Sequence, residues 1–151
     1  MRRLSATVGT KVMSSASAQQ VGTVQRALID VPPRRIVALQ VGRDELVDWQ
    51  AILGVGPDAV VIEDESRVRA AADAREERAL GGELDWKGKR VLSDLGDELG
   101  TVTEVEFDEA DGAIQSVGTT TGPVAAERLH ALGSYCLVVR HSAGDGDLPE
   151  Q

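Results

Sequence analysis

Histidine and cysteine, the side chains that most often bind transition metals or act as nucleophiles, are scarce in this sequence of 151 residues. The only candidates are His130, His141 and Cys136. Cys136 and His141 are five positions apart in a segment that reads as a strand, so their side chains are expected on opposite faces. Two potential ligands also fall short of a structural zinc site. We therefore predict that the protein has neither a metal ion nor another cofactor.

Carboxylates are the second group of side chains that could do chemistry, as paired general acids and bases. Glu104 and Glu106 lie two positions apart in an alternating segment, so both are expected to face solvent. Solvent-exposed carboxylates make poor general acids. The sequence also has no Gly-x-Ser-x-Gly elbow, no P-loop and no partnered Ser/His/Asp set. These observations predict that the protein is not an enzyme.

The acidic side chains are unevenly distributed along the chain, which has a net charge of -9. Residues 1–64 contain 7 basic and 7 acidic side chains, and residues 65–82 contain 4 of each. Residues 83–151 contain 5 basic and 14 acidic side chains. This excess would repel a phosphate backbone and attract a basic protein surface. We therefore expect a protein partner with a basic surface and no direct contact with nucleic acid.

Two acidic stretches, SDLGDE at 93–98 and DEADG at 108–112, concentrate carboxylates at turns, and neither has the order of a calcium loop. Asp and Gly predict a hairpin turn for DEADG, and cation binding is the alternative. The acidic face is either a solvated surface that keeps a small domain soluble or a docking face. PPRR at 32–35 would be a basic tip that touches the acidic face of another protomer, giving head-to-tail self-association or a homodimer. The candidate protein-binding residues are Asp94, Asp97, Glu98, Glu104, Glu106, Asp108, Asp111, Arg34 and Arg35.

The segments that must position these residues occur twice in the chain. GTKV at 9–12 matches GKRV at 88–91 at an offset of 79, and VGTV at 21–24 matches LGTV at 99–102 at an offset of 78. AILGVGPDAVVI at 51–62 matches RLHALGSYCLVV at 128–139 at an offset of 77. Alternating or β-branched segments predict strands in both copies. They cover 23–30, 35–41 and 59–63 in the first copy and 101–108, 112–118 and 136–141 in the second.

The segment between the copies has a different composition. Residues 65–80 are rich in Ala, Arg and Glu and predict a helix, with Asp64 or Ser66 as its cap and Gly81 at its end. Its apolar stripe is thin, so we expect a connector that packs lightly on its neighbours. The predicted organisation is a first copy at 1–64, a helical linker at 65–82, a second copy at 83–142 and a flexible acidic tail at 143–151.

Each copy contains Gly-x-x-Val, a polar turn, Leu/Val-Gly-x-Val, a hairpin and a β-branched final strand. This pattern resembles the PRC-barrel domain, the small β-barrel of the photosynthetic reaction-centre H subunit and of the ribosome maturation factor. The resemblance covers about residues 5–64 and 84–141. It implies an all-β protein with two small barrels in tandem, joined by a short helix. It also implies a module for protein interaction or assembly, because the family is typically non-catalytic.

The function predicted from the sequence is a non-catalytic interaction or assembly module that uses the acidic face of the second copy. The alternative is an accessory factor in ribosome or RNA maturation that docks on a basic ribosomal protein. The N-terminus lacks the apolar segment of a signal peptide, and no stretch is long enough to span a bilayer, so a cytoplasmic location is expected. We expect Trp49 and Trp86 each to plug a barrel end; the alternative is that both face the seam between the copies.

Overall fold

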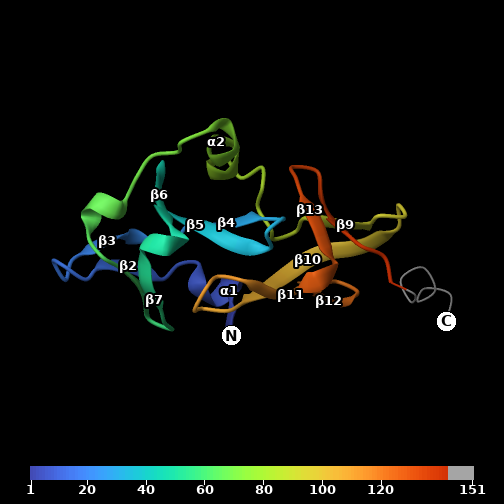
Figure 1. Ribbon diagram of the computed structural model, residues 1–151, viewed down its shortest axis with the longest axis horizontal. Coiled ribbons are helices and arrows are strands. Elements are labelled where there is room, and N and C mark those ends of the chain that lie inside the picture. The colour runs from blue at the N-terminus through green and yellow to red at the C-terminus, as the bar shows by residue number, and fades with distance from the viewer. Residues whose placement is uncertain (143–151) are drawn as a thin grey trace.

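The computed structural model describes residues 1–142, in which β-strands are the main secondary structure (Figure 1). The acidic tail predicted for residues 143–151 lies outside the described residues. The strands of the first half are β1 (Arg2–Arg3), β2 (Lys11–Ser14), β3 (Gln20–Thr23), β4 (Arg26–Asp30), β5 (Arg35–Gly42), β6 (Glu45–Asp48), β7 (Ile52–Val55) and β8 (Ala59–Ile62). Those of the second half are β9 (Arg90–Ser93), β10 (Glu98–Phe107), β11 (Ile114–Thr119), β12 (Gly122–Ala125), β13 (Leu129–Leu132) and β14 (Cys136–Val139).

Helices are short and few in the described part of the chain. Two are α-helices, α1 (Leu4–Thr7) and α2 (Ala74–Leu80). Three are single 3-10 turns, η1 (Trp49–Ala51), η2 (Glu65–Arg67) and η3 (Ala126–Arg128). Among residues 1–142, no helix combines the length and the apolar character that a membrane crossing requires.

The two halves have the same order of strands, and equivalent strands pair in equivalent registers. β2 runs parallel to β8 with Val12 opposite Val60. β9 runs parallel to β14 with Val91 opposite Leu137. The sequence offsets of 79 and 77 align these same residues, Val12 with Val91 and Val60 with Leu137. The apolar pattern of each half thus produces the same strand pairing.

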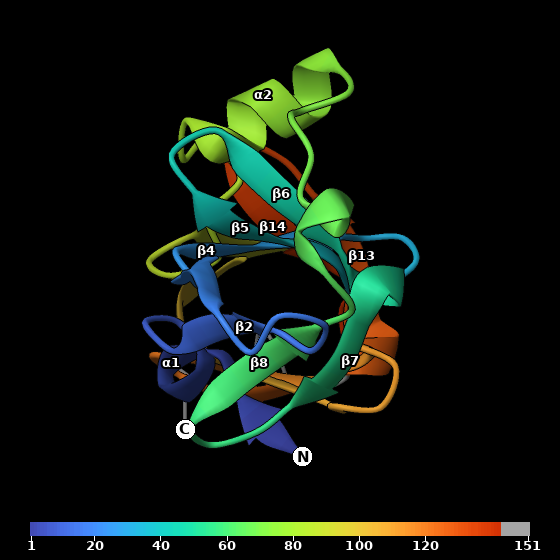
Figure 2. The same cartoon turned by 90° about the vertical axis from the view of Figure 1, so that its left-hand side faces the viewer.

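Hydrogen bonds do not close either half into a barrel within residues 1–142. The second half is a single sheet, in the order β12-β11-β10-β9-β14-β13, with β12 and β13 at its edges. The first half is split into the sheets β3-β2-β8-β7 and β4-β5-β6, which face each other as two layers in Figure 2. The split occurs because the chain changes partner: the Val24 N–H donates to Thr10 (2.9 Å) and the Gln25 N–H to Gln40 (2.8 Å). The expected closed barrels are therefore corrected to open sheets.

The halves meet at a reciprocal seam. The Ile36 N–H donates to the carbonyl of Gly112, and the Ile114 N–H donates to the carbonyl of Arg34, both over 2.9 Å. Ile36 and Ile114 are equivalent at the sequence offset of 78, and so are Arg34 and Gly112. Each half therefore makes the same contact with the other, as expected for two units related by a local twofold axis. One continuous hydrophobic core extends through both halves.

Both tryptophans lie at this seam, so the expectation that each plugs the end of its own barrel is wrong. Trp49, from the first half, packs edge-to-face against Phe107 of the second half, with ring centroids 6.0 Å apart. Trp86, from the second half, lines an apolar cavity together with Ile29 and Val31 of the first. Only 7% of Trp49 and 8% of Trp86 is exposed. The aromatic area thus holds the two halves together.

The N-terminal residues, which the sequence assigned to the first copy, pack on the second half. β1 pairs with the end of β10, where Arg3 lies opposite Glu106. Leu4 is fully buried in the shared core. The backbone N–H of Ser5 donates to the Glu104 carboxylate over 3.0 Å. The second half is therefore completed by residues from the beginning of the chain.

The linker is only partly helical, which corrects the helix expected over residues 65–80. Glu65–Arg67 form a 3-10 turn capped by Asp64, and α2 begins after Asp73, whose carboxylate accepts the Glu76 N–H over 2.8 Å. Between them Arg69 pairs with Leu46 of β6 through two backbone hydrogen bonds of 2.7 and 2.8 Å. Pairing with the sheet thus overrides the helix propensity of this segment.

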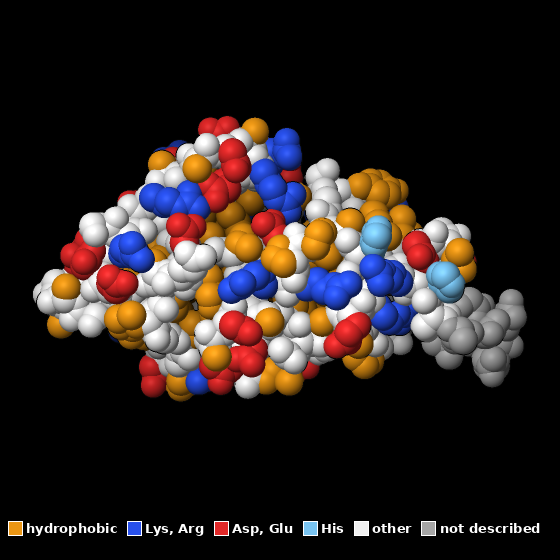
Figure 3. Space-filling model, viewed as in Figure 1, with side chains coloured by type: hydrophobic (Ala, Val, Ile, Leu, Met, Phe, Trp, Pro, Cys, Tyr) orange, Lys and Arg blue, Asp and Glu red, His pale blue; other side chains and the backbone are white. Residues whose placement is uncertain are grey.

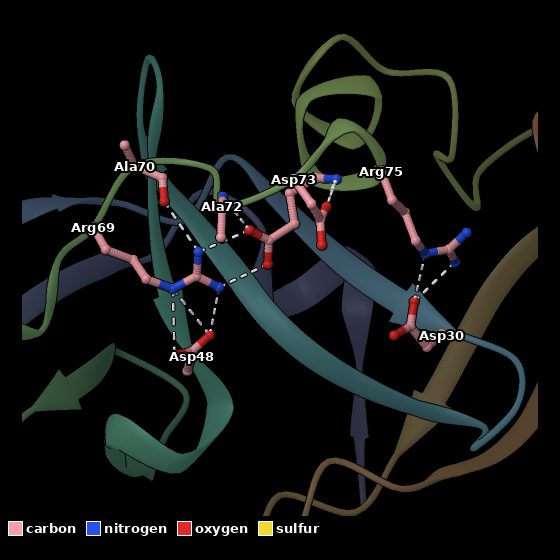
Figure 4. A network of polar contacts seen from close by, with 8 residues as sticks. Asp30, Asp48, Arg69, Ala70, Ala72, Asp73 and Arg75 are labelled. Carbon is pink, nitrogen blue, oxygen red and sulfur yellow. Dashed lines mark hydrogen bonds and ion pairs between the residues drawn. The ribbon is translucent and has the colours of Figure 1, made fainter.

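Ion pairs and apolar contacts hold the linker on the first half, so it does not pack lightly as expected (Figure 4). Arg69 lies 2.6 Å from the Asp48 carboxylate and 2.7 Å from that of Glu76. Hydrogen bonds to Glu76 and Asp48 raise the pKa of the Arg69 guanidinium, and the same bond lowers the pKa of Glu76. Arg75 pairs with Asp30 at 2.8 Å. A small apolar cluster under α2 consists of Leu28, Ala38, Leu46, Ala79 and Leu84.

Replacing Arg69 with alanine is expected to lower the free energy of unfolding by about 1 to 2 kcal/mol, because two carboxylates lose a charged hydrogen-bond donor. Arg67→Ala is the matched control, since Arg67 makes only a 3.7 Å contact with Glu63. The control should change the stability by less than about 0.5 kcal/mol. Urea denaturation measures both changes, and equal losses would show that the Arg69 contacts do not hold the linker.

Candidate protein-binding surface

The β9–β10 hairpin presents three of the candidate acids together at an exposed turn. Ser93, at the end of β9, is 4% exposed, and its hydroxyl accepts the N–H groups of Leu95 and Asp97 over 3.2 Å. Gly96 adopts a φ of +91°, which closes the turn and which L-residues rarely adopt. Asp94, Asp97 and Glu98 are therefore exposed on a turn of defined shape.

Asp94 has a partner beyond the turn. Its carboxylate accepts the backbone N–H of His141 over 2.9 Å and contacts the His141 ring at 2.7 Å. The bond to the His141 side chain, followed by that to its backbone, lowers the pKa of Asp94 below its ordinary value. Asp94 is consequently ionised throughout the neutral range, and the hairpin keeps its negative charge.

The pKa of the Asp94 carboxyl is expected to rise toward its ordinary value in the His141→Ala variant, where only the backbone bond remains. Because the pKa is lowered in the folded state, Asp94 stabilises the fold above its ordinary pKa, and this contribution is lost as the pH falls through the folded value. Carboxyl-carbon NMR titration measures the shift, with His130→Ala as the control. An unchanged Asp94 pKa in His141→Ala would contradict the role of the ring contact.

Glu98 connects this turn to the neighbouring strand. Its carboxylate lies 3.0 Å from the guanidinium of Arg90, the first residue of β9. Both side chains are at least half exposed, 50% for Arg90 and 58% for Glu98. An exposed pair of this kind contributes little stability, so both groups can reorganise to meet a partner.

The two candidate acids on the strand are half-buried, which corrects the expectation that they face solvent. The α1 segment covers Glu104, whose carboxylate accepts both the N–H and the hydroxyl of Ser5. Glu106 accepts the hydroxyl of Ser116 on the neighbouring strand over 2.9 Å. The sequence pattern shows which side of the strand these acids occupy, but not that a distant segment covers that side.

The two remaining acids stabilise the β10–β11 turn. The Asp108 carboxylate accepts the N–H of Ala110 over 2.8 Å, and that of Asp111 accepts the N–H of Ala113 over 2.9 Å. These are local turn bonds, which explain why aspartate occurs there. This turn and the β9–β10 hairpin flank opposite ends of β10, whose ten residues span about 30 Å. The predicted acidic face is therefore two separate groups.

Arg34 and Arg35 lie at the seam between the halves. The Arg34 Nε donates to the Leu129 carbonyl over 2.8 Å, and an Arg35 Nη donates to the Asp111 carbonyl over 2.7 Å. The basic tip thus contacts the second half of its own chain. Figure 3 shows Lys and Arg side chains across the face of the molecule that it draws, with Asp and Glu side chains next to them. This face therefore has mixed charge.

Clusters of metal-ligating side chains and cavities are the other features of residues 1–142 that could form a site. Among residues 1–142, no group of three or more His, Cys, Asp or Glu side chains could hold a metal ion. The apolar cavity that Trp86 lines together with Ile29 and Val31 has a volume of about 20 Å³, far below that of a small-molecule site. A larger and more open hollow of about 480 Å³ lies beside β9. The exposed β9–β10 hairpin, where Asp94, Asp97 and Glu98 lie together, is the candidate protein-binding site.

Leu95 is the functional candidate that the sequence reasoning missed. It lies at the tip of this hairpin between the acids, and 67% of it is exposed. A leucine inside a turn of Asp and Gly was the available signal, because turn positions rarely provide burial for a large apolar side chain. A single exposed apolar residue is ordinary on a protein surface, so Leu95 is a candidate because it lies between the exposed acids of this turn.

Residues 85–140 match the family model of the PRC-barrel domain. The matched range extends from just before β9 to just after β14 and so contains all six strands of the second half. No curated protein matches the chain. The match supports a PRC-barrel domain in the second half, in agreement with the resemblance inferred from its motifs.

Proposed function

We propose that the PRC-barrel domain at residues 85–140 makes this protein a non-catalytic interaction or assembly module. Its binding site is the β9–β10 hairpin, defined by Asp94, Leu95, Asp97 and Glu98, and its partner is a basic protein surface. The observation that carries the proposal is the exposure of all four side chains on one shaped turn. Asp94 and Glu98 also contact His141 and Arg90, but their side chains remain exposed. Glu104 and Glu106, in contrast, are half-buried by their contacts within the chain.

We further propose that residues 5–64 are a second copy of the same domain. The supporting observations are the equivalent registers of β2 with β8 and of β9 with β14. The Gly9 N–H also donates to Val24 as the Gly88 N–H donates to Val102, over 2.7 and 2.8 Å. In this arrangement the first copy supports the second through the shared core, and the second presents the binding turn.

Binding of a basic peptide tests the site. Isotope-labelled protein is titrated with a synthetic peptide of alternating lysine and leucine, and NMR shifts are expected to change at residues 94–98. Replacing Asp94, Asp97 and Glu98 with lysine should abolish these shifts, and added salt should weaken them. The control variant replaces Asp44, Asp58 and Glu127 with lysine. These three residues are exposed and lie outside the hairpin, so the control has the same change in net charge. If both triple variants lose the peptide-induced shifts equally, the binding depends only on net charge, and the proposed site is refuted.

A further inference from the structure

A basic hollow lies beside the acidic hairpin. It has a volume of about 480 Å³, and its lining includes Lys87, Lys89, Arg90 and Tyr135. Its lining also includes one acid, Asp85, whose carboxylate is paired with Arg26 at 2.5 Å. Residues 83–151 have only five basic side chains, so three of the five are concentrated at this one place. The Lys89 ammonium is anchored by the carbonyls of Glu83 and Ser134, over 2.8 and 3.0 Å. The hollow is therefore a positive site within the negative half of the chain.

Arg90 makes the hollow and the hairpin one continuous surface. Its guanidinium lies 5.4 Å from the centre of the Tyr135 ring, and it donates to the Tyr135 hydroxyl over 2.8 Å. The same guanidinium lies 3.0 Å from Glu98 of the hairpin. The surface therefore has a basic end and an acidic end, which meet at the Arg90–Glu98 pair.

Each end of this surface also has one exposed apolar side chain. Tyr135 at the basic end is 69% exposed, and Leu95 at the acidic end is 67% exposed. The large apolar side chains exposed among residues 1–142 are Met1, Val8, Leu53, Leu95 and Tyr135. Two of these five thus belong to the surface, and a partner with the opposite arrangement of charge would cover both.

We propose that this surface binds a second copy of the chain and forms a closed twofold homodimer. A twofold rotation about an axis near the Arg90–Glu98 pair places the acidic end of one copy on the basic end of the other, and the reverse. It also places Leu95 against Tyr135 twice. The inference deepens the proposed function by identifying the basic protein surface that the hairpin binds, and it rests on that function.

The net charge of -9 on each copy does not prevent this contact. At physiological ionic strength the screening length is about 8 Å, so acids far from the interface contribute little repulsion. The paired ends lie in direct contact and are screened much less. Complementary charge then selects the register of the dimer, and the two Leu95–Tyr135 contacts contribute apolar burial.

Charge reversal with complementation tests the dimer. One variant replaces Lys87 and Arg90 with glutamate, so both of its ends are acidic; the other replaces Asp97 and Glu98 with lysine, so both are basic. Sedimentation equilibrium should give a homodimer dissociation constant at least about tenfold higher for each variant than for the wild type. An equimolar mixture should recover the wild-type affinity, because both contacts of the mixed dimer are complementary.

Two control variants have the same charge changes away from this surface, at exposed residues. They are Lys11→Glu with Arg43→Glu, and Asp44→Lys with Asp58→Lys, and they should dimerise as the wild type does. Thermal unfolding confirms that every variant is folded. A wild type that stays monomeric to about 1 mM, or a mixture that remains dissociated, would overturn the homodimer. In that case, changes in the NMR shifts of residues 94–98 on addition of the basic peptide would still support the proposed function. The two proposals can therefore fail separately.

Discussion

Gly112→Ala is expected to lower the free energy of unfolding by about 3 to 4 kcal/mol, because two costs act at one position. The residue has a φ of +76°, which L-residues rarely adopt. A Cβ at this position would lie 2.9 Å from Cε2 of Trp49 and 3.1 Å from the carbonyl oxygen of Ile36. Neither the buried indole nor the seam backbone can move away without loss of packing.

Gly88→Ala separates these two costs. Gly88 has nearly the same φ, +77°, but a Cβ there would have no neighbour within 4 Å. We therefore expect Gly88→Ala to lower the free energy of unfolding by about 1 to 2 kcal/mol, the cost of the backbone conformation alone. Urea denaturation followed by tryptophan fluorescence measures both variants. If the two variants lose equal stability, the seam around Trp49 is looser than the structure indicates.

The six segments predicted as strands overlap β4, β5, β8, β10, β11 and β14, because their alternating or β-branched pattern is a local signal. The short strands β6, β7, β12 and β13 were not predicted. Val12 and Val60 face the core as Val91 and Leu137 do, and the repeated apolar pattern locates all four without any knowledge of the tertiary structure. The turns were equally accessible, since glycine and aspartate occur at them for local reasons. The second half, where the family model matches, follows the same pattern.

The parts that could not be predicted depend on contacts between distant segments. Arg69 lies in a sequence of good helix formers, yet it pairs with Leu46, far away in the chain. Trp49 has the same local pattern whether it fills a barrel end or the seam, and only Phe107 and Gly112 decide between them. Helix propensity and hydrophobic periodicity depend only on neighbouring residues, so they cannot predict contacts with distant segments.

The candidate site was predictable as a region but not in its detail. The acidic bias of the second half pointed to Asp94 and Glu98, and both lie on the exposed hairpin. The same bias pointed equally to Glu104, which the N-terminal segment covers. Net charge therefore identifies a half of the chain, whereas burial by other segments determines which of its acids remain available to a partner.

Phe107→Ala is expected to cost about 3 to 5 kcal/mol, the usual range for removal of a buried aromatic ring. Phe107 is fully buried and packs edge-to-face on Trp49 across the seam. Because the core is continuous through both halves, the variant should still unfold in one transition, at a lower urea concentration. Phe107→Leu, which leaves a smaller cavity, should lose less than half as much.

Two probes decide whether the halves depend on each other in this way. Tryptophan fluorescence reports the seam, where Trp49 and Trp86 lie, and far-ultraviolet circular dichroism reports the strands of both halves. Coincident transitions in the wild type and in Phe107→Ala are expected, since loss of the second half would expose the apolar face of the first. Separate transitions, with only one shifted by the substitution, would mean that each half folds alone and that the seam adds little stability.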